Sequence, residues 1–267
     1  MPEGHTIHRL AREHTAHFAG APVSLSSPQG RFRAAAEVLD GITLRRVDAY
    51  GKHLFYRFDG DRVVHVHLGL YGKWWPFTPP APPTTHQVRL RIDGGAHGAD
   101  LTGPTTCELL TTEGAAGVTA RLGPDPLRRD ADPDRAWSRL ARRRGPIGVA
   151  IMDQAVVAGV GNVYRAEALF VNGIHPEQPG SSLTRDQWDA LWSTLVRMLR
   201  QGVTDGRIVT VDPDELGVAR RAIPTAEGRY VYKREACIRC GNAIRRWDLA
   251  GRWAYACPVC QPLAARP

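Results

Sequence analysis

Apolar and polar positions follow two different periods along this chain, and the change of period separates its parts. Ile7, Leu10 and Ala11 recur at helical spacing, which predicts a helix with Thr6 as its N-cap. Runs with the alternation and composition of β-strands come next. The predicted strands cover residues 43–48, 54–58, 63–68, 88–92 and 107–111. One helix followed by many short strands predicts a β-sandwich or barrel in the first part of the chain.

Turn and helix signals organise the rest of the chain. Asp59-Gly60-Asp61 predicts a hairpin turn, and residues 76–86, with five prolines, predict a stiff loop. The turn-forming run 122–126 marks a boundary, after which residues 134–201 follow the helical period. We therefore expect a β-rich domain over 1–120, a helical domain over 121–202, and a loop region followed by a cysteine-bearing hairpin over 203–267.

The composition indicates a folded protein of the cytoplasm. Hydrophobic residues make up 43% of the 267 residues, which is enough for a packed core and argues against general disorder. No run approaches the roughly 20 apolar residues of a membrane span, and the N-terminus lacks the pattern of a signal peptide. In a reducing cytoplasm, cysteines are more often metal ligands than disulfide partners.

The distribution of charge points to a binding surface. The chain has 35 basic and 27 acidic residues and a net charge of +8, which favours a polyanionic partner. From residue 229 to the end, eight basic residues stand against two acidic ones, so three quarters of the net charge lies in this segment. Four of the five cysteines lie there as well. The fifth, Cys107, stands alone in a predicted strand and is expected to be an ordinary buried thiol.

The four clustered cysteines form two C-x-x-C pairs, Cys237/Cys240 and Cys257/Cys260, separated by 16 residues. This spacing is typical of a four-thiolate zinc site, in which each pair supplies two sulfurs of a tetrahedron. A chance arrangement and a pair of disulfides are the alternatives. Because four protein ligands leave no open coordination position, the expected cofactor is one structural Zn²⁺. It would hold a basic hairpin with Arg252 at its tip.

Several motifs then occur in order: Pro2-Glu3-Gly4, Gly51-Lys52, Gly159-Val160-Gly161-Asn162, and the four-cysteine hairpin with Gly251-Arg252. In this combination the chain resembles the formamidopyrimidine-DNA glycosylase/endonuclease VIII family over essentially its whole length. The opening Met-Pro-Glu-Gly-His is most similar to the actinobacterial endonuclease VIII branch. The resemblance implies an α+β fold. It would comprise an N-terminal β-sandwich lobe with an N-terminal helix, a helix–two-turn–helix lobe, and a C-terminal β-hairpin zinc finger.

The resemblance also implies base-excision repair of damaged DNA by a glycosylase with abasic-site lyase activity. Pro2 would be the nucleophile once Met1 is removed, because an α-amine with a pKa of about 7.7–8.0 keeps a neutral fraction near pH 7. Its attack on C1′ of the deoxyribose would expel the base and form a Schiff base, which activates the sugar for β,δ-elimination. Glu3 would act as a general acid on the sugar. The alternative for Glu3 is a surface carboxylate that stabilises a helix N-terminus.

Further residues are expected, by the resemblance, to contact the DNA backbone. Lys52 would bind phosphates at the lesion and assist β-elimination. Arg252 would grip the phosphates that flank the flipped nucleotide and assist δ-elimination, since its planar fork suits phosphate. Asn162 stands at a helix start, where phosphates are readily bound, and Arg121 matches another family contact. From the residues alone, a solvated arginine at a boundary explains Arg121 nearly as well.

Excision requires taking the base out of the stack, and an apolar or aromatic wedge can fill the gap. Leu70 and Tyr71 occupy the wedge position of the endonuclease VIII branch; a place in a hydrophobic core is the alternative. The chain departs from the family pattern at two points. His5-Thr6 stands where relatives carry Pro-Glu, and Gly69 replaces a polar wedge residue. Both departures leave the rate and the lesion preference open.

The remaining expectations concern partners. The resemblance implies a monomer that acts on oxidised bases near the bacterial nucleoid, without a membrane or a nucleotide cofactor. Pyrimidines are the expected bases from the endonuclease VIII branch, and the oxidised purines of the sister branch are the alternative. A non-catalytic, zinc-stabilised DNA-binding protein that senses lesions or abasic sites is the second hypothesis. The presence of Pro2, Glu3 and Lys52 together favours the enzyme. His65 and His67 could share a metal on one strand face, but we expect ordinary strand histidines.

Overall fold

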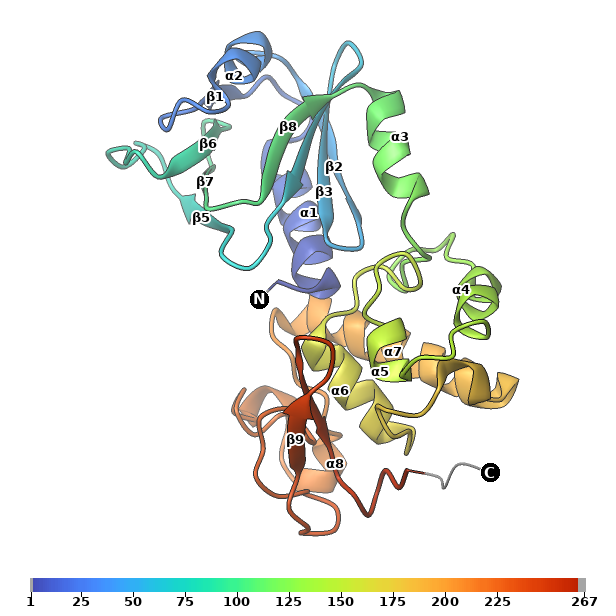
Figure 1. Cartoon of the computed structure of the whole chain (residues 1–267). Coiled ribbons are helices and arrows are strands. Elements are labelled where there is room, and N and C mark those ends of the chain that lie inside the picture. Colours follow the sequence, from blue (N-terminus) through green and yellow to red (C-terminus); the bar gives the residue numbers. More distant parts are fainter. Residues whose placement is uncertain (1, 264–267) are drawn as a thin grey trace. The chain divides into compact units, whose positions relative to one another are not determined.

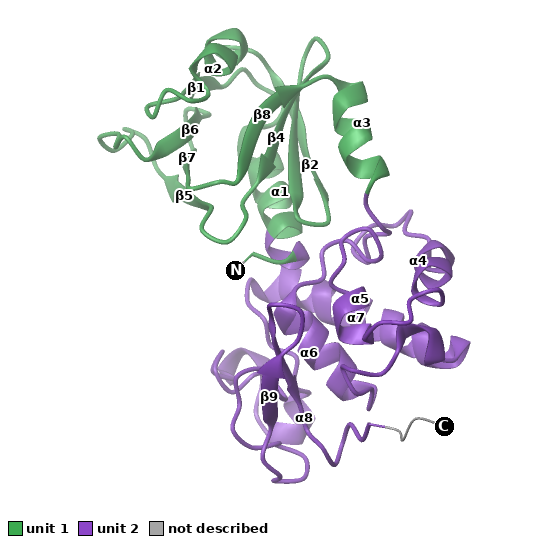
Figure 2. Ribbon diagram, in the orientation of Figure 1, with its two compact units in different colours: residues 1–3, 7–121 green, residues 4–6, 122–267 purple. Residues whose placement is uncertain are grey.

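The computed structural model describes residues 2–263. The chain divides into two compact units, which Figure 2 shows in different colours. Unit 1 comprises residues 1–3 and 7–121, and unit 2 comprises residues 4–6 and 122–267. The first three residues of the first helix are therefore assigned to unit 2, and the rest of that helix to unit 1.

Unit 1 is built on two antiparallel four-stranded sheets, with the orders β2-β3-β4-β8 and β1-β6-β7-β5 (Figure 1). The strands are β1 (Ser24–Ser26), β2 (Leu44–Tyr50), β3 (His53–Phe58), β4 (Arg62–His67), β5 (Lys73–Phe77), β6 (Val88–Asp93), β7 (Gly98–Thr102) and β8 (Thr106–Leu110). The helices are α1 (Gly4–Phe18), α2 (Arg33–Leu39) and α3 (Thr112–Ala120). The five predicted strands all exist, and the N-terminal sheet lobe is confirmed.

Alternation along β3 and β4 directs side chains to two faces of their sheet, and both faces are covered. Leu54 and Val66 face the main core, which also contains residues of the second sheet and of α1. Phe55 and Val63 face the other side, where they pack with Ala115 of α3. The alternation in the sequence therefore corresponds to side chains that point in turn to the two faces of the sheet. Helix α3 was not predicted.

The first helix begins earlier than predicted. Helix α1 starts at Gly4 with Glu3 as its N-cap, and Thr6 lies inside it, so the assignment of Thr6 as the cap was wrong. No side chain caps this end. Instead the Gly4 N–H donates to the carbonyl oxygen of Gly159 at 2.8 Å. Because that acceptor is remote in sequence, local capping signals could not locate the helix start.

The proline-rich segment is only partly a loop. Pro76 and Phe77, which were assigned to a stiff loop, are the last residues of β5. β5 is an edge strand that pairs with β7 alone, and an edge position tolerates a proline that cannot donate a hydrogen bond. The turn predicted at Asp59-Gly60-Asp61 is confirmed, because it joins β3 to β4 with positive φ angles at Gly60 (74°) and Asp61 (55°).

Unit 2 carries the predicted helical part of the chain. Its helices are α4 (Pro133–Leu140), α5 (Ile147–Ala150), α6 (Asn162–Val171), α7 (Arg185–Asp205) and α8 (Pro213–Leu216), with 3-10 turns η1 (Gly180–Ser182) and η2 (Arg220–Ala222). Helix α7 begins with a capping box formed by Thr184 and Gln187 and ends at Gly206, whose φ is 67°. Trp188 and Leu195 of α7 are buried against α6 in the core of this unit.

A two-stranded hairpin of β9 (Arg245–Asp248) and β10 (Trp253–Ala256) follows, as predicted. A separate apolar cluster fixes it to α6 through Phe170, which packs with Tyr230, Tyr255 and Cys257. Over residues 2–263, no helix combines the length and the apolar character that crossing a membrane requires.

Candidate functional site

The four cysteines predicted to bind a metal converge at the open end of the hairpin. Sγ of Cys237 lies 3.8 Å from Sγ of Cys260, Sγ of Cys240 lies 3.4 Å from Sγ of Cys257, and all four lie within 4.8 Å of one another. Zinc bonds of about 2.3 Å place tetrahedral sulfurs about 3.8 Å apart, so the four thiolates fit this metal. All four are free thiols, which excludes the disulfide alternative. Cys107 is half-buried in β8, and burial raises the pKa of its thiol to about 12.

The hairpin presents Arg252 at a tight turn. Ala250 and Gly251 form this turn with φ angles of 53° and 75°, and the N–H of Leu249 donates to the carbonyl oxygen of Arg252 at 2.9 Å. Positive φ at two successive positions is the geometry of a tight hairpin turn, which a glycine adopts without strain. Arg252 is exposed, as predicted for the tip.

Asn162 and Arg252 are brought together through Trp253, the residue that follows Arg252. The Asn162 side chain donates from Nδ2 to the carbonyl oxygen of Trp253 at 3.1 Å. Arg165 donates to the same oxygen at 2.8 Å and to the carbonyl oxygen of Gly148 at 3.2 Å. Arg165 is only 2% exposed and was missed in the sequence, although an arginine within an apolar helical run is a usable signal.

Glu167, five residues after Asn162 in α6, was missed as well. Its carboxylate is fully buried and accepts hydrogen bonds from the backbone N–H groups of Tyr230 (2.6 Å), Val231 (3.0 Å) and Tyr232 (2.8 Å), and from the hydroxyl of Thr210. The carboxylate therefore joins the two ends of the segment 211–229 to α6. A charged acceptor with several donors compensates for the cost of burying it.

Pro2 and Glu3 directly precede α1. Pro2 is partly exposed and Glu3 is fully buried, so the alternative of a surface carboxylate at position 3 is wrong. The next residue is a glycine in a close approach to another glycine, because a Cβ on Gly4 would lie 3.0 Å from the Cα of Gly159. The backbone that carries Pro2 and Glu3 is thus held by a close main-chain approach.

Lys52 lies in the tight turn between β2 and β3, after Gly51 with a φ of 57°. Next to it, Nδ1 of His53 is 2.8 Å from Nε2 of His65. Burial lowers the pKa of His53 to about 3, and the charges of Arg121, the C-cap of α3, and of Lys52 add to the effect. In the part of the chain that the structure describes, the four cysteines are the one group of three or more side chains with metal-ligand geometry, and His65 and His67 lie on β4 outside it.

Leu70 and Tyr71 project from the loop between β4 and β5. Tyr71 is 86% exposed and Leu70 is 49% exposed, which excludes the alternative that they close a core. The loop is tight, because the Gly72 N–H donates to the carbonyl oxygen of Leu68 at 2.9 Å and a Cβ on Gly72 would clash with Leu68. Exposed apolar side chains on a fixed loop are suited to insertion between stacked bases.

Comparison with known proteins identifies the family. Two family models match: the formamidopyrimidine-DNA glycosylase N-terminal domain over residues 1–102 and the formamidopyrimidine-DNA glycosylase H2TH domain over residues 122–212. Endonuclease 8 1 of Mycobacterium tuberculosis is 50% identical over 267 residues, which cover 98% of this chain and 100% of that protein. The formamidopyrimidine-DNA glycosylase of Chloroflexus aurantiacus is 31% identical over 280 residues, with 100% of both chains covered. The chain belongs to the formamidopyrimidine-DNA glycosylase/endonuclease VIII family.

Solved structures of this family confirm the fold. A Lactococcus lactis Fpg bound to DNA containing N7-benzyl-Fapy-dG matches with a TM-score of 0.81 and 24% identity, over 98% of this chain and 100% of that one. The Lactococcus lactis Fpg in complex with DNA containing an abasic site matches with a TM-score of 0.79. The full-length relatives make this glycosylase a base-excision repair enzyme with abasic-site lyase activity.

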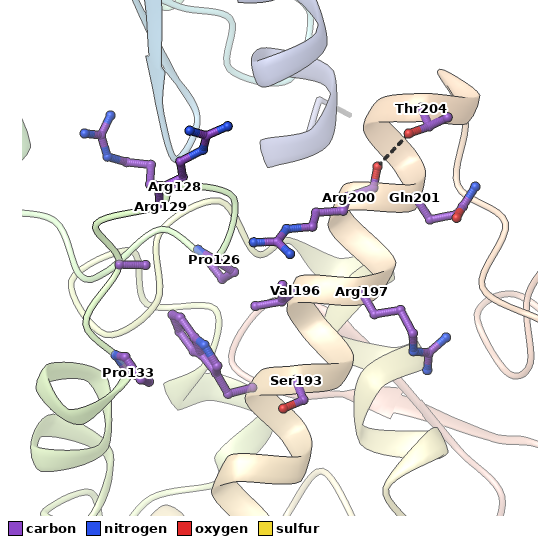
Figure 3. A pocket seen from close by; sticks show the side chains of 12 residues that line it. Pro126, Arg128, Arg129, Pro133, Ser193, Val196, Arg197, Arg200, Gln201 and Thr204 are labelled. Carbon is purple, nitrogen blue, oxygen red and sulfur yellow. Dashed lines mark hydrogen bonds between the residues drawn. The ribbon is translucent and has the colours of Figure 1, made fainter.

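The glycosylase has a second basic surface, which the sequence did not reveal. A cavity of about 740 Å³ in unit 2 lies between the loop from Pro126 to Pro133 and helix α7 (Figure 3). Arg200 extends from α7 toward Pro126, and Arg128 and Arg129 belong to the loop (Figure 3). Arg129 and Arg200 form no ion pair with any residue from 2 to 263, whereas Arg128 binds Asp130 at 2.7 Å. Arginines without acidic partners are suited to bind anions.

Proposed function

We propose that this glycosylase excises oxidised bases, pyrimidines in the first place, and cleaves the strand at the resulting abasic site through a Schiff base on Pro2. Once Met1 is removed, the Pro2 secondary amine attacks C1′ with its lone pair. The bond from C1′ to the base breaks, and its electron pair leaves with the base. Loss of a C2′ proton then expels the 3′ phosphate, and a second elimination expels the 5′ phosphate.

The observation that carries this proposal is the position of Pro2 and Glu3 directly before α1, in a chain 50% identical over nearly its full length to an endonuclease 8. A partly exposed amine remains accessible to a sugar. A buried carboxylate beside it can hold a proton and deliver it to the sugar oxygen, which is the role of a general acid. The missing second carboxylate, where His5-Thr6 stands, leaves Glu3 to act by itself.

The other residues are assigned to holding the DNA. Lys52 binds phosphates at the lesion and assists β-elimination, and Arg252 binds the flanking phosphates and assists δ-elimination. Asn162 and Arg121 contact the backbone. Leu70 and Tyr71 fill the gap that the flipped base leaves, and their exposure supports this role.

The four cysteines would hold one structural Zn²⁺, which would supply a rigid link at the base of the hairpin. Cys237 and Cys240 approach it from the segment before β9, and Cys257 and Cys260 from the segment after β10. The enzyme works as a monomer on damaged DNA at the nucleoid, without a nucleotide cofactor. We assign the enzyme three domains, which cover residues 1–120, 121–202 and 203–267.

Borohydride trapping tests the proposed chemistry. Incubation with a duplex that carries an abasic site or an oxidised pyrimidine, in the presence of borohydride, should give a covalent protein–DNA adduct in wild type, and peptide mapping should locate the DNA on Pro2. Glu3→Gln should still form the adduct on an abasic site, where no base has to leave, but should excise a base slowly. An adduct that maps to another residue, such as a lysine, rules out Pro2 as the nucleophile. Binding without any adduct favours the second hypothesis, a lesion sensor.

A further inference from the structure

One face of the sheet β2-β3-β4-β8 carries polar side chains that the proposed chemistry does not use. His65 pairs with Glu108 across β4 and β8, and His53 is the diagonal neighbour of His65 across β3 and β4. Nδ1 of His53 is 2.8 Å from Nε2 of His65, and Nδ1 of His65 is 2.8 Å from Oε1 of Glu108. The His65 side chain is 5% exposed and the Glu108 side chain 48% exposed. A chain of two hydrogen bonds therefore runs from a half-exposed carboxylate to His53.

Hydrogen-bond chemistry determines where the protons of this chain lie. A carboxylate only accepts hydrogen bonds, so His65 donates to Glu108 from Nδ1. Nε2 of a neutral His65 then carries no proton and accepts the hydrogen bond from Nδ1–H of His53. Nε2 of a neutral His53 is consequently a bare acceptor. It is the nitrogen at which His53 gains a proton when it becomes charged.

Positive charge surrounds His53. Burial lowers the pKa of His53 to about 3, and repulsion from His67, His65, Arg121 and Lys52 adds to the effect. Burial also lowers the pKa of His67, again with contributions from His65 and Lys52. Lys52 comes from the turn before β3, His67 from β4 and Arg121 from the end of α3. Separate elements of unit 1 thus bring basic groups to one place.

The strands next to β3 carry further polar groups near His53. Tyr50 of β2 lies opposite His53. Asp48, further along β2, is paired with Arg57 and with Arg46. Glu108 reaches His53 through His65. Lys52, Arg121 and the hydrogen-bonded histidines therefore form a group of side chains suited to a phosphate.

We propose that this cluster is a proton-linked phosphate site, in which His53 is a further DNA contact. When a phosphodiester reaches Lys52 and Arg121, its negative charge offsets the repulsion among the cations. Nε2 of His53 then takes up one proton from solvent and donates the new N–H to a phosphate oxygen. Nδ1–H of His53 stays bonded to His65, and Glu108 stabilises the added positive charge through His65. This role of His53 rests on the proposed contact between Lys52 and DNA phosphates.

Counting the protons that accompany DNA binding tests the proposal. The full chain is titrated calorimetrically at pH 6 with a duplex that carries an uncleavable tetrahydrofuran abasic analogue, in buffers of different ionisation enthalpy. We expect H53Q to take up about one proton fewer than wild type, so the slope of log Kd against pH falls by about one. E108Q should lose part of the same uptake. H86Q and E37Q, which alter exposed side chains elsewhere in unit 1, should match wild type. Equal uptake in wild type and H53Q overturns the proposal.

Nitrogen-15 NMR of the wild-type chain provides a measurement that needs no variant. In the free protein, His53 and His65 should both carry their proton on Nδ1, and addition of the duplex should protonate Nε2 of His53. A free-state proton on Nε2 of His53, or an unchanged His53 on DNA binding, contradicts the site. Neither experiment involves the Schiff base. A failed borohydride trap would therefore contradict the proposed Schiff base on Pro2. It would not affect the test of proton uptake by His53.

Discussion

The side chain of Asn162 and the backbone of Trp253 are 91 residues apart in sequence and meet through a hydrogen bond of 3.1 Å. Arg165 donates to the same carbonyl oxygen at 2.8 Å. Because Trp253 follows Arg252 directly, helix α6 fixes the backbone beside the residue that we assign to the flanking phosphates. The tip of the hairpin is thus positioned by buried polar contacts, as well as by the cysteine cluster at its other end.

Replacing Arg165 by methionine should show the value of this contact. The change removes charge-assisted hydrogen bonds to two carbonyl oxygens, so we expect the free energy of unfolding to fall by about 2–3 kcal/mol. DNA affinity should also fall, and we expect a loss similar to that in R252A, because the tip is no longer held. Urea unfolding and DNA titration measure the two effects. R142M, at an exposed arginine, is the matched control. A loss of stability with unchanged affinity would show that Arg165 does not position Arg252.

Glu167→Gln should loosen the segment 211–229. A glutamine side chain can accept with one oxygen only, and its NH₂ group would face backbone N–H groups of residues 230–232. We expect a loss of about 2–3 kcal/mol in the free energy of unfolding and faster proteolysis within this segment. Glu227→Gln, an exposed change in the same segment, is the control. Equal cleavage of the two variants would contradict an anchoring role for Glu167.

The contacts of Arg165 and Glu167 show which features of the structure can be predicted from the sequence and which cannot. The cysteine ligands and the turn at Gly251 follow from local rules, because a metal or a hairpin constrains residues a few positions apart. Arg165 and Glu167 have their partners on segments far along the chain, and no local pattern reveals such partners. The same holds for the start of α1, which depends on Gly159 and not on a capping side chain. Pro76 can lie within a strand because β5 is at the edge of its sheet. A single sequence does not show which strand will be at an edge.

Removal of zinc should abolish DNA binding without unfolding unit 1. A metal held by the four cysteines would link the segments that carry Cys237 and Cys257, whereas the core of unit 1 contains none of these cysteines. We expect chelation to abolish lesion binding and to leave the β-sheet signal in circular dichroism largely intact. Adding zinc back should restore binding. Global unfolding on chelation would contradict this separation.

His14 should make the stability of the protein depend on pH. Its Nδ1 is 2.8 Å from the hydroxyl oxygen of Tyr56, and burial, with repulsion from His17, lowers its pKa from 6.5 to about 3. The unfolded chain therefore binds a proton first as the pH falls. The contribution of His14 is present above about pH 6.5 and is lost toward pH 3, by about 1.4 kcal/mol per pH unit. Urea unfolding across this range should show a shallower slope in H14Q than in wild type. H86Q should keep the wild-type slope, and equal slopes in H14Q and H86Q would contradict the assignment.

The arginine-lined cavity of unit 2 should contribute to DNA affinity. Arg129 and Arg200 have no acidic partner among residues 2–263, so their charge remains available to phosphates. If each neutralises one phosphate, R129Q/R200Q should reduce the slope of log affinity against log salt by about 1.8 for duplex DNA. R142Q/R144Q removes the same charge from exposed positions outside the cavity and is the matched control. A smaller slope in the cavity variant alone identifies a second phosphate-binding surface. Equal slopes in both variants would mean that only the overall charge matters, because long-range attraction does not distinguish the two pairs.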